Sequence, residues 1–475
     1  MKNVVTYLGA VLKIYSLFLL LPIVAAMIVK EDPSLFIISV IITLIVGICI
    51  QVYAKRKYKE FEFEVLSLGE CFLLTGVSFI VVCIIGCIPF LWYFGYNILD
   101  ALFASVSGFT TTGMGMFASP FALPKSLLLW YSETQWIGGL GIIVLFLFLV
   151  TNLIRKHESV AKQEDELETH YSLLKAQGYS ERFEVGIGKV TTRIFYVYLF
   201  FTAIGFILLT VAGLGPYESI VLTFSTISTG GFSNLNVMEF FNTRVIFVLC
   251  SIMLIGAISF LVHLKLLRGN IRAFFANVRF YVLLIIVFTL LALSVSFKPE
   301  TAFYVVSALT TTGHTIPHTM PPLVFLLIVV GMLIGGGVGS TAGGMKVSRV
   351  YLALKSIGWH IKKLVSPKRA VIPLRIYDTS IDKDTLLSTY IFMFTYLIIV
   401  GLAGFVFVWL GFSLSDSFFN VASAIGNVGF TTIVIPDSSP LVKLLLMGLM
   451  VLGRLEVFPV LVMLNRIWFR IKKNF

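Results

Sequence analysis

Long apolar runs separated by short polar loops are the feature that most constrains how this 475-residue chain can fold. A helix needs about 20 apolar residues to cross a bilayer. Hydrophobic residues make up 58% of the chain and charged residues 13%, whereas a soluble domain carries about 25% charged residues. We therefore expect an all-α integral membrane protein, and the same balance excludes a soluble globule and a disordered chain. The candidate spans are residues 8–29, 35–52, 68–93, 126–152, 194–214, 245–267, 281–297, 323–335, 386–412 and 441–469.

The charged loops predict the orientation of these spans. Lys and Arg together number 36 against 24 for Asp and Glu, and the basic residues gather in alternate loops. Because cytoplasmic loops carry an excess of basic residues, we expect these loops and both termini on the cytoplasmic side. This distribution is typical of a multi-pass protein in a lipid bilayer and not of a nucleic-acid-binding surface. The basic loops contain residues 55–59, 155–156, 265–279, 349–369 and 466–473.

Four outward connections share one pattern, in which an apolar stretch ends in a Thr-Gly or Val-Gly turn at residues 107–113, 224–230, 307–313 and 423–429. An acidic residue precedes the final glycine by 13 positions in three turns and by 12 in the second; these residues are Asp100, Glu218, Glu300 and Asp416. Chance recurrence in a Thr-rich chain is the alternative, but all four turns occupy corresponding places between spans. The pattern predicts four pseudo-repeated helix–pore-loop–helix units around a central pore, after two extra N-terminal transmembrane helices.

Each unit would comprise a span, the acidic residue, a short apolar helix, the turn and a second span. The expected boundaries are residues 1–60 for the N-terminal extension, 61–155 for the first unit, 156–185 for a cytoplasmic loop, 186–270 for the second unit, 271–380 for the third unit with a broken second helix and a basic loop, and 381–475 for the fourth unit.

The turns are suited to binding an alkali cation. Non-helical backbone at membrane depth is tolerated where protein buries it or where it lines a water-filled cavity. Carbonyl oxygens around one axis replace the hydration shell of K⁺ in channel filters, and glycine adopts a positive φ at little cost. The acidic residues at the opposite helix ends either cap the helices or attract cations. The candidate filter residues are Thr111, Thr112, Gly113, Ser228, Thr229, Gly230, Thr311, Thr312, Gly313, Asn427, Val428 and Gly429.

A glycine-rich stretch interrupts the eighth candidate span. Each glycine costs about 1 kcal/mol relative to alanine in a helix, so a broken span facing the cavity is expected. A phosphate-binding loop is disfavoured because no strand precedes it, and close helix packing through small residues is the structural alternative. We favour a flexible gating loop that obstructs the pore beneath the filter. Its residues are Gly335, Gly336, Gly337, Gly339, Ser340, Thr341, Gly343 and Gly344.

Arg454 lies deep in the last candidate span. A charge there costs about 2.5–3.5 kcal/mol on insertion scales, so it normally faces a cavity or a partner. Glu456 is two residues away and lies on a different helix face. Two interpretations stay open for Arg454: pairing with a carboxylate or with backbone carbonyls, or a gating role as a cationic barrier that weakens cation binding in the cavity.

Other function classes fit the sequence less well. A serine hydrolase would need Ser340 beside His314 or His318, which are expected at the other end of the pore. Those histidines are more simply explained as hydrogen-bonded surface residues. A carrier for an anionic metabolite would need helix N-termini directed at the ligand. No enzyme activity is therefore expected.

With these turns, the chain resembles the Trk/Ktr/HKT superfamily of potassium transporters, and in particular its TrkH/TrkG branch. Three further motifs carry the resemblance: residues 135–142 (QWIGGLGI), 339–346 (GSTAGGMK) and 453–456 (GRLE). The resemblance implies potassium uptake through a carbonyl-lined selectivity filter with an intramembrane gating loop. The alternative is a less selective K⁺/Na⁺ channel or a cation-coupled symporter. The implied filter glycines are Gly113, Gly230, Gly313 and Gly429, and Arg454 is the implied cavity arginine.

The resemblance also implies a homodimer, a cytosolic TrkA-type regulatory ring on the basic face, and a location in the inner (plasma) membrane of a bacterium. ATP, ADP or NAD(H) would bind that ring, because the chain has no Rossmann or Walker pattern, and no covalent cofactor is expected. His314 and Phe430 after the third and fourth glycines, and Asn427 in the fourth turn, depart from the family pattern. These departures bear on the strictness of K⁺ over Na⁺ selection.

Overall fold

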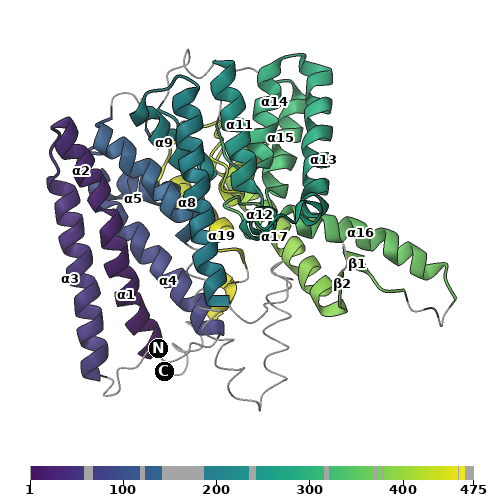
Figure 1. Cartoon of the computed structure of the whole chain (residues 1–475), viewed down its shortest axis with the longest axis horizontal. Helices are drawn as coiled ribbons and strands as arrows, with labels where there is room; N and C mark the ends of the chain where they lie inside the picture. The colour runs from purple at the N-terminus through teal and green to yellow at the C-terminus, as the bar shows by residue number, and fades with distance from the viewer. Residues whose placement is uncertain are drawn as a thin grey trace.

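The structure is a computed structural model that describes residues 2–57, 68–117, 123–141, 187–234, 242–314, 320–367, 370, 372–376, 379–457 and 459–465. Most of its long helices run along one direction (Figure 1). The strands within the described part are β1 (Arg375–Ile376) and β2 (Thr379–Ser380), which pair antiparallel with Arg375 opposite Ser380. The helical, membrane-embedded fold expected from the apolar runs is confirmed.

Six helices of the described chain are long and apolar enough to cross a membrane. They are Val4–Val29, made of α1 (Lys2–Phe18) and α2 (Leu20–Val29); α3 (Ser34–Lys57); Gly69–Phe90, made of α4 (Leu68–Gly86) and η1 (Ile88–Phe90); Thr192–Val211 within α8 (Ile187–Val211); α13 (Ile271–Ser296); and α17 (Lys383–Trp409). Only 17% of the apolar window of α13 is buried inside the protein. Such helices are apolar all round because lipid replaces water at their outer faces.

Two predicted spans are wrong as continuous helices. The sequence predicts one span for residues 245–267, but α11 (Thr243–Ala257) and α12 (Phe260–Leu267) meet at a bend of 102°. The last predicted span, residues 441–469, likewise breaks after α19 (Pro440–Arg454), with a bend of 110° before the helix Pro459–Asn465. Freed backbone groups at such breaks need partners within the protein, and the site described below supplies them.

The remaining predicted spans are partly covered. The short helix α15 (Pro322–Ile334) ends where the glycine-rich stretch begins, as expected, and α16 (Val347–Leu364) follows the stretch. Residues 125–141 are helical, while the rest of the run 126–152 and the predicted loop 156–185 lie outside the described residues.

Four short helices precede the predicted turns: α5 (Ile98–Phe109), α9 (Pro216–Ile227), α14 (Pro299–Leu309) and α18 (Leu414–Ile425). Their N-termini follow local sequence signals. The side chains of Asn97 and Ser413 accept hydrogen bonds from first-turn amides of α5 and α18, whereas α9 and α14 begin with proline, which has no amide hydrogen to satisfy. Each short helix carries an acidic residue in its first turn.

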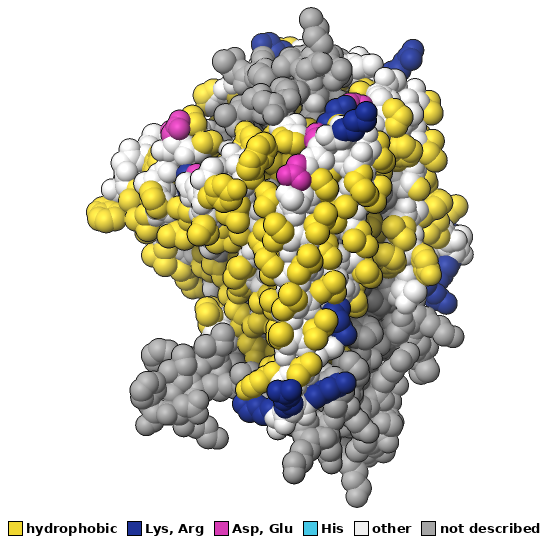
Figure 2. Space-filling view, turned by 90° about the vertical axis from the view of Figure 1, so that its left-hand side faces the viewer, with side chains coloured by type: hydrophobic (Ala, Val, Ile, Leu, Met, Phe, Trp, Pro, Cys, Tyr) yellow, Lys and Arg dark blue, Asp and Glu magenta, His cyan; other side chains and the backbone are white. Residues whose placement is uncertain are grey.

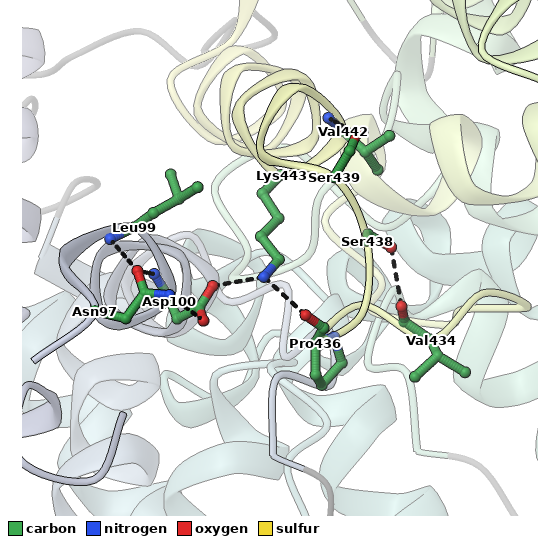
Figure 3. Close-up of polar contacts among 9 residues, drawn as sticks. All are labelled: Asn97, Leu99, Asp100, Val434, Pro436, Ser438, Ser439, Val442 and Lys443. Atoms are coloured by element: carbon green, nitrogen blue, oxygen red, sulfur yellow. Dashed lines mark hydrogen bonds and ion pairs between the residues drawn. The ribbon is translucent and has the colours of Figure 1, made fainter. Parts of the chain in front are cut away.

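An ion pair joins α5 to α19 (Figure 3). Lys443 Nζ lies 2.6 Å from Asp100 Oδ1 and donates a hydrogen bond to the Pro436 carbonyl at 2.9 Å. Asn97 Nδ2 also donates to Asp100 Oδ2 at 2.8 Å. The side chains of Lys443 and Asp100 are only 6% and 16% exposed. Because solvent barely screens this pair, the early helix α5 and the late helix α19 are fixed to each other.

Small residues hold the N-terminal hairpin of α1, α2 and α3 together, and a cap joins it to the rest of the bundle. A Cβ atom added to Gly47 of α3 would lie 3.1 Å from the Gly9 carbonyl oxygen of α1, so these helices approach closely. The Glu31 carboxylate accepts hydrogen bonds from the amides of Lys125 at 2.8 Å and Ser126 at 2.9 Å. It thereby caps the helix of residues 125–141.

An apolar belt crosses the face on which α3 lies. Ile38, Ile41, Ile45 and Ile48 of α3 are all exposed, and Figure 2 shows apolar side chains covering the middle of this face, with charged side chains toward its two ends. An apolar surface of this extent is stable in contact with lipid and not with water.

Candidate functional site

The same backbone turn follows each of the four short helices. Its first residue is left-handed, with φ of 55° at Thr111, 55° at Thr229, 53° at Thr311 and 53° at Asn427. Two positions later stands a glycine with φ of 68° at Gly113, 73° at Gly231, 82° at Gly313 and 96° at Gly429. L side chains rarely adopt such angles, so the conformation explains why each turn ends in glycine.

The four turns form a closed ring of backbone contacts. In each turn the glycine is so close to a neighbouring turn that an added Cβ atom would overlap a carbonyl oxygen there. The pairs are Gly113 with Gly230, Gly231 with Thr312, Gly313 with Val428, and Gly429 with Thr112. Each turn therefore abuts the next, and the fourth abuts the first, so the turns encircle one axis.

The amide groups of the turns bond back to serine carbonyls of the short helices. The bonds run from Thr112 to Ser107 at 3.0 Å, Gly230 to Ser225 at 2.7 Å, Thr312 to Ser307 at 2.9 Å and Val428 to Ser423 at 2.9 Å. Among the described residues, the carbonyls of the two residues before each glycine accept no hydrogen bond, apart from that of Gly230, which accepts one from Gln135 Nε2 at 2.8 Å. Helix C-termini add negative potential here. The ring thus offers oxygens to a cation.

The second turn is shifted by one residue from the sequence alignment of the turns. The structure places Thr229, Gly230 and Gly231 where the other turns have Thr111–Gly113, Thr311–Gly313 and Asn427–Gly429. Ser228 instead ends α9, as Thr110 ends α5. The spacing between the acidic residue and the glycine indicates this register, because Glu218 precedes Gly231 by the 13 positions seen in the other three units.

Sequence reasoning also missed a serine that lies six positions before each ring glycine. Ser107, Ser225 and Ser307 donate through Oγ to the carbonyls that follow the turns, at Met114, Phe232 and His314, over 3.2, 2.6 and 3.0 Å. In the fourth unit, Ser423 Oγ accepts a 3.1 Å bond from the Gly429 amide. These serines hold both sides of each turn to its short helix, and their equal spacing could have identified them.

The glycine-rich stretch between α15 and α16 packs directly against the ring. Thr341 Oγ1 donates to the carbonyls of Ile227 at 3.0 Å and Gly256 at 2.9 Å, and the Gly343 amide donates to Thr311 Oγ1 at 2.7 Å. A Cβ atom added to Gly343 would overlap the Gly426 carbonyl oxygen. The predicted loop residues, from Gly335 to Gly344, all lie in this non-helical stretch. The stretch therefore contacts the ends of the second, third and fourth short helices.

The break between α11 and α12 lies against the glycine-rich stretch, and the two segments satisfy each other's backbone hydrogen bonds. The Gly337 amide donates to the Ala257 carbonyl at 2.8 Å, and the Phe260 amide donates to the Gly339 carbonyl at 3.0 Å. Backbone groups released by one broken helix thus bond to those of the other, as membrane burial requires.

Arg454 ends α19 and bonds to backbone carbonyls. Its Nη1 donates to Thr341 at 2.5 Å, and Nη2 donates to Gly138 and Gly139 at 2.6 Å each. Of the two sequence interpretations, carbonyl pairing is thus observed, and it leaves a cation beside the ring. Glu456 pairs instead with Arg349 of α16 at 2.7 Å.

The other candidate residues lie apart from one another. Asp416 accepts a 2.6 Å hydrogen bond from Ser413 Oγ, and this bond lowers the pKa of its carboxyl group. Ser340 Oγ donates to Gly337 at 2.6 Å, whereas His314 bonds to Thr226, so these two residues do not form a hydrolase pair. His314 is 1% exposed, which corrects its assignment to the surface. His318 lies outside the described residues.

Comparison with known proteins places this architecture in a family. The TrkH family model, described as cation transport protein, matches residues 37–298 and 298–468. An uncharacterised cation transporter of Methanocaldococcus jannaschii is 31% identical over 482 residues, covering 99% of this chain and 96% of that protein. The Trk system potassium uptake protein TrkH of Halomonas elongata is 27% identical over 501 residues, covering 99% of both.

A solved structure agrees with these matches. The crystal structure of the potassium transporter TrkH from Vibrio parahaemolyticus has a TM-score of 0.80 and 25% identity, covering 98% of each chain. The family model covers most of the chain, and the members of the family are transporters and not enzymes. The chain therefore belongs to the TrkH family of cation transport proteins.

Proposed function

We propose that this chain conducts potassium ions into the cell as the ion-conducting subunit of a Trk-type uptake system. The observation that carries the proposal is the closed ring of four turns, in which the carbonyls of the two residues before each glycine accept no hydrogen bond among the described residues, save that of Gly230. Such oxygens replace the hydration shell of a permeating K⁺. The relatives named as potassium uptake proteins support this choice of ion.

The proposed filter consists of three residues from each turn. They are Thr111, Thr112 and Gly113; Thr229, Gly230 and Gly231; Thr311, Thr312 and Gly313; and Asn427, Val428 and Gly429. Ser228 supports the filter from the end of α9, where its Oγ donates to the Phe224 carbonyl at 2.7 Å.

The proposed gate is the glycine-rich stretch from Gly335 to Gly344. Its bonds to Ile227 and Thr311 hold it against the ring, where it would obstruct a pore. Arg454 holds the stretch through the Thr341 carbonyl. The guanidinium charge would also weaken cation binding next to the filter and so speed release.

The proposed setting follows from charge and family membership. Inward movement of one K⁺ gains about 2.3 kcal/mol per 100 mV of membrane potential, so the chain needs no nucleotide of its own. We place the basic loops and both termini in the cytoplasm of a bacterial cell, with the chain in the inner membrane. A homodimer, with a TrkA-type ring that binds ATP, ADP or NAD(H), completes the proposed system.

A less selective K⁺/Na⁺ channel, or a cation-coupled symporter, is the second candidate. Two observations favour it: the Gly230 carbonyl is already hydrogen-bonded to Gln135, and Asn427 and Val428 replace threonines in the fourth turn. Fewer equivalent oxygen ligands would reduce discrimination between the two ions.

Rubidium and sodium uptake into liposomes that contain the purified protein tests the proposal, with Gly313→Ser as the variant. We expect the wild type to prefer rubidium. A serine at position 313 would have φ near +82° and its Cβ would overlap the Val428 carbonyl, so we expect relaxed selectivity in the variant. Gly401→Ser is the control, because a Cβ atom at Gly401 meets nothing within 4 Å. Equal uptake of both ions by the wild type would favour the second candidate, and the absence of cation flux would refute transport.

A further inference from the structure

The residues directly after the four ring glycines are all buried and differ in one respect. Met114, Phe232 and Phe430 are 0%, 6% and 3% exposed, and their apolar side chains contribute packing. His314, at the corresponding place in the third unit, is 1% exposed and carries hydrogen-bonding nitrogens. A buried imidazole is tolerated where it has polar partners.

The partners of His314 belong to the second unit. His314 Nε2 lies 2.8 Å from Thr226 Oγ1 in the last turn of α9, and the imidazole also interacts with the backbone of Gly231. The Thr226 carbonyl accepts a 3.0 Å bond from the Thr229 amide, where the second turn begins. The imidazole therefore contacts the helix end and the ring glycine of the second turn.

The main chain of His314 is fixed within its own unit. Its carbonyl oxygen accepts a 3.0 Å bond from Ser307 Oγ of α14. The residue thus connects the third turn, through its backbone, to the second turn, through its side chain. The second turn is the one with two consecutive glycines, Gly230 and Gly231, so its backbone has the greatest conformational freedom of the four.

Side chains make comparable connections at two other boundaries of the ring. Asn427 Nδ2 of the fourth turn lies 3.1 Å from Thr112 Oγ1 of the first. Gln135, from the helix after the first turn, donates to the Gly230 carbonyl of the second. His314 supplies a side-chain bond between the second and third units at the level of the ring, beside the bond that Thr341 of the third unit donates to the Ile227 carbonyl.

We propose that His314 is a positioning residue for ion selection, which acts through Thr226 to hold the second turn at the separation from the third that the ring requires. Discrimination between ions of different radius depends on the placement and number of the carbonyl dipoles. Without the His314–Thr226 bond, the glycine pair of the second turn is free to move outward. The ring with its second turn displaced would favour neither ion strongly. This inference rests on the proposed filter function.

The test measures the ratio of rubidium to sodium uptake in liposomes for five variants: His314→Phe, His314→Gln, Thr226→Val, the double variant His314→Phe/Thr226→Val, and Thr223→Val. Phenylalanine matches the size of the residues after the second and fourth glycines, and glutamine keeps a polar group. Thr223 is the matched control, since it is buried on the same helix and its hydroxyl has no hydrogen-bonding partner in the described part of the chain.

We expect His314→Phe and Thr226→Val each to lower the uptake ratio about three- to tenfold, the range that the loss of one hydrogen bond allows. The double variant should be no lower than the more affected single variant, because both changes remove the same bond. His314→Gln should recover most of the ratio, and Thr223→Val should stay within about twofold of wild type.

The inference is overturned if the wild type is selective while His314→Phe and Thr226→Val keep its ratio, or if Thr223→Val lowers the ratio as much as Thr226→Val does. A wild type with no rubidium preference would instead refute the proposed filter itself. For a variant without measurable flux, the difference between the thermal unfolding midpoints in rubidium and in sodium replaces the uptake ratio. If the midpoints of His314→Phe in the two ions differ by as much as those of the wild type, the inference is also overturned.

Discussion

At the residue scale, the turns are defined by backbone conformation more than by side-chain identity. Thr111, Thr229 and Thr311 are β-branched residues in the left-handed region, a conformation that costs about 1–2 kcal/mol. Asn427, which tolerates this region better, occupies the fourth position and donates to Thr112 Oγ1 and to the Met450 carbonyl. Strain kept at the same place in four segments is typical of a functional site.

The first prediction separates Gly231 from Gly230. Gly231→Ala would place a Cβ atom on the Thr312 carbonyl at a φ of 73°, whereas a Cβ atom at Gly230, which is not among the glycines with positive φ, would meet side-chain atoms of Gln135 and no backbone atom of a neighbouring turn. We expect Gly231→Ala to lower the rubidium-to-sodium uptake ratio about tenfold and Gly230→Ala to lower it less. Liposome uptake measures both, and the reverse order would show that the second turn has the register given by the sequence alignment.

At the element scale, the helices that follow the second, third and fourth turns break near the ring. The breaks come after Ala257, Ile334 and Arg454. Their open backbone groups bond to one another and to Arg454, so the ring is backed by backbone that is not locked in a continuous helix. Such a segment can exchange one set of hydrogen bonds for another, as a gate requires.

The second prediction concerns Thr341. Thr341→Val removes the buried hydroxyl whose hydrogen is shared by the Ile227 and Gly256 carbonyls and which holds the glycine-rich stretch against the ring. We expect the rubidium flux to rise about fivefold with an unchanged rubidium-to-sodium ratio, because the obstructed state is destabilised while the filter stays intact. Thr341→Ser, which keeps the hydroxyl, should behave like wild type. A fall in the uptake ratio without a rise in flux would mean that the stretch supports the filter and does not gate it.

At the scale of the whole molecule, long-range polar contacts close the bundle. Lys443 and Asp100 are 343 positions apart, yet their ion pair fixes α19 to the first turn of α5 (Figure 3). Glu31 joins the N-terminal hairpin to the helix of residues 125–141. The membrane solvates the apolar belt (Figure 2), so such contacts, together with close packing, determine how the helices associate.

The third prediction tests this closure. Lys443→Met leaves Asp100 without its cation in a largely buried place, and we expect the free energy of unfolding to fall by about 3 kcal/mol. Asp100→Asn combined with Lys443→Met should recover much of the loss, since no unpaired charge remains. The thermal unfolding midpoint in detergent reports both effects, with Lys383→Met at an exposed position as the control. An additive loss in the double variant would show that the two residues contribute independently.

Composition and local pattern were sufficient to predict the all-α membrane fold, the approximate spans and the positions of the turns to within one residue. Apolar length, glycine and N-capping residues act locally, so they can be read from the chain. The helix break after Ala257 could not be predicted, because no proline interrupts its apolar run, whereas Pro459 indicates that the last run does not continue as one helix. The backbone partners at the Ala257 break come from distant segments.

The sequence by itself determined that this protein lies in a membrane and presents four glycine turns, because lipid solvation and backbone conformation depend on residue type. Only the tertiary structure decided that Gly231 and not Gly230 joins the ring, that Arg454 bonds to carbonyls, and that His314 is buried against Thr226. The physical reason is that each of these outcomes depends on which backbone group of another unit lies within hydrogen-bonding or van der Waals distance. Spacing along one segment does not contain that information.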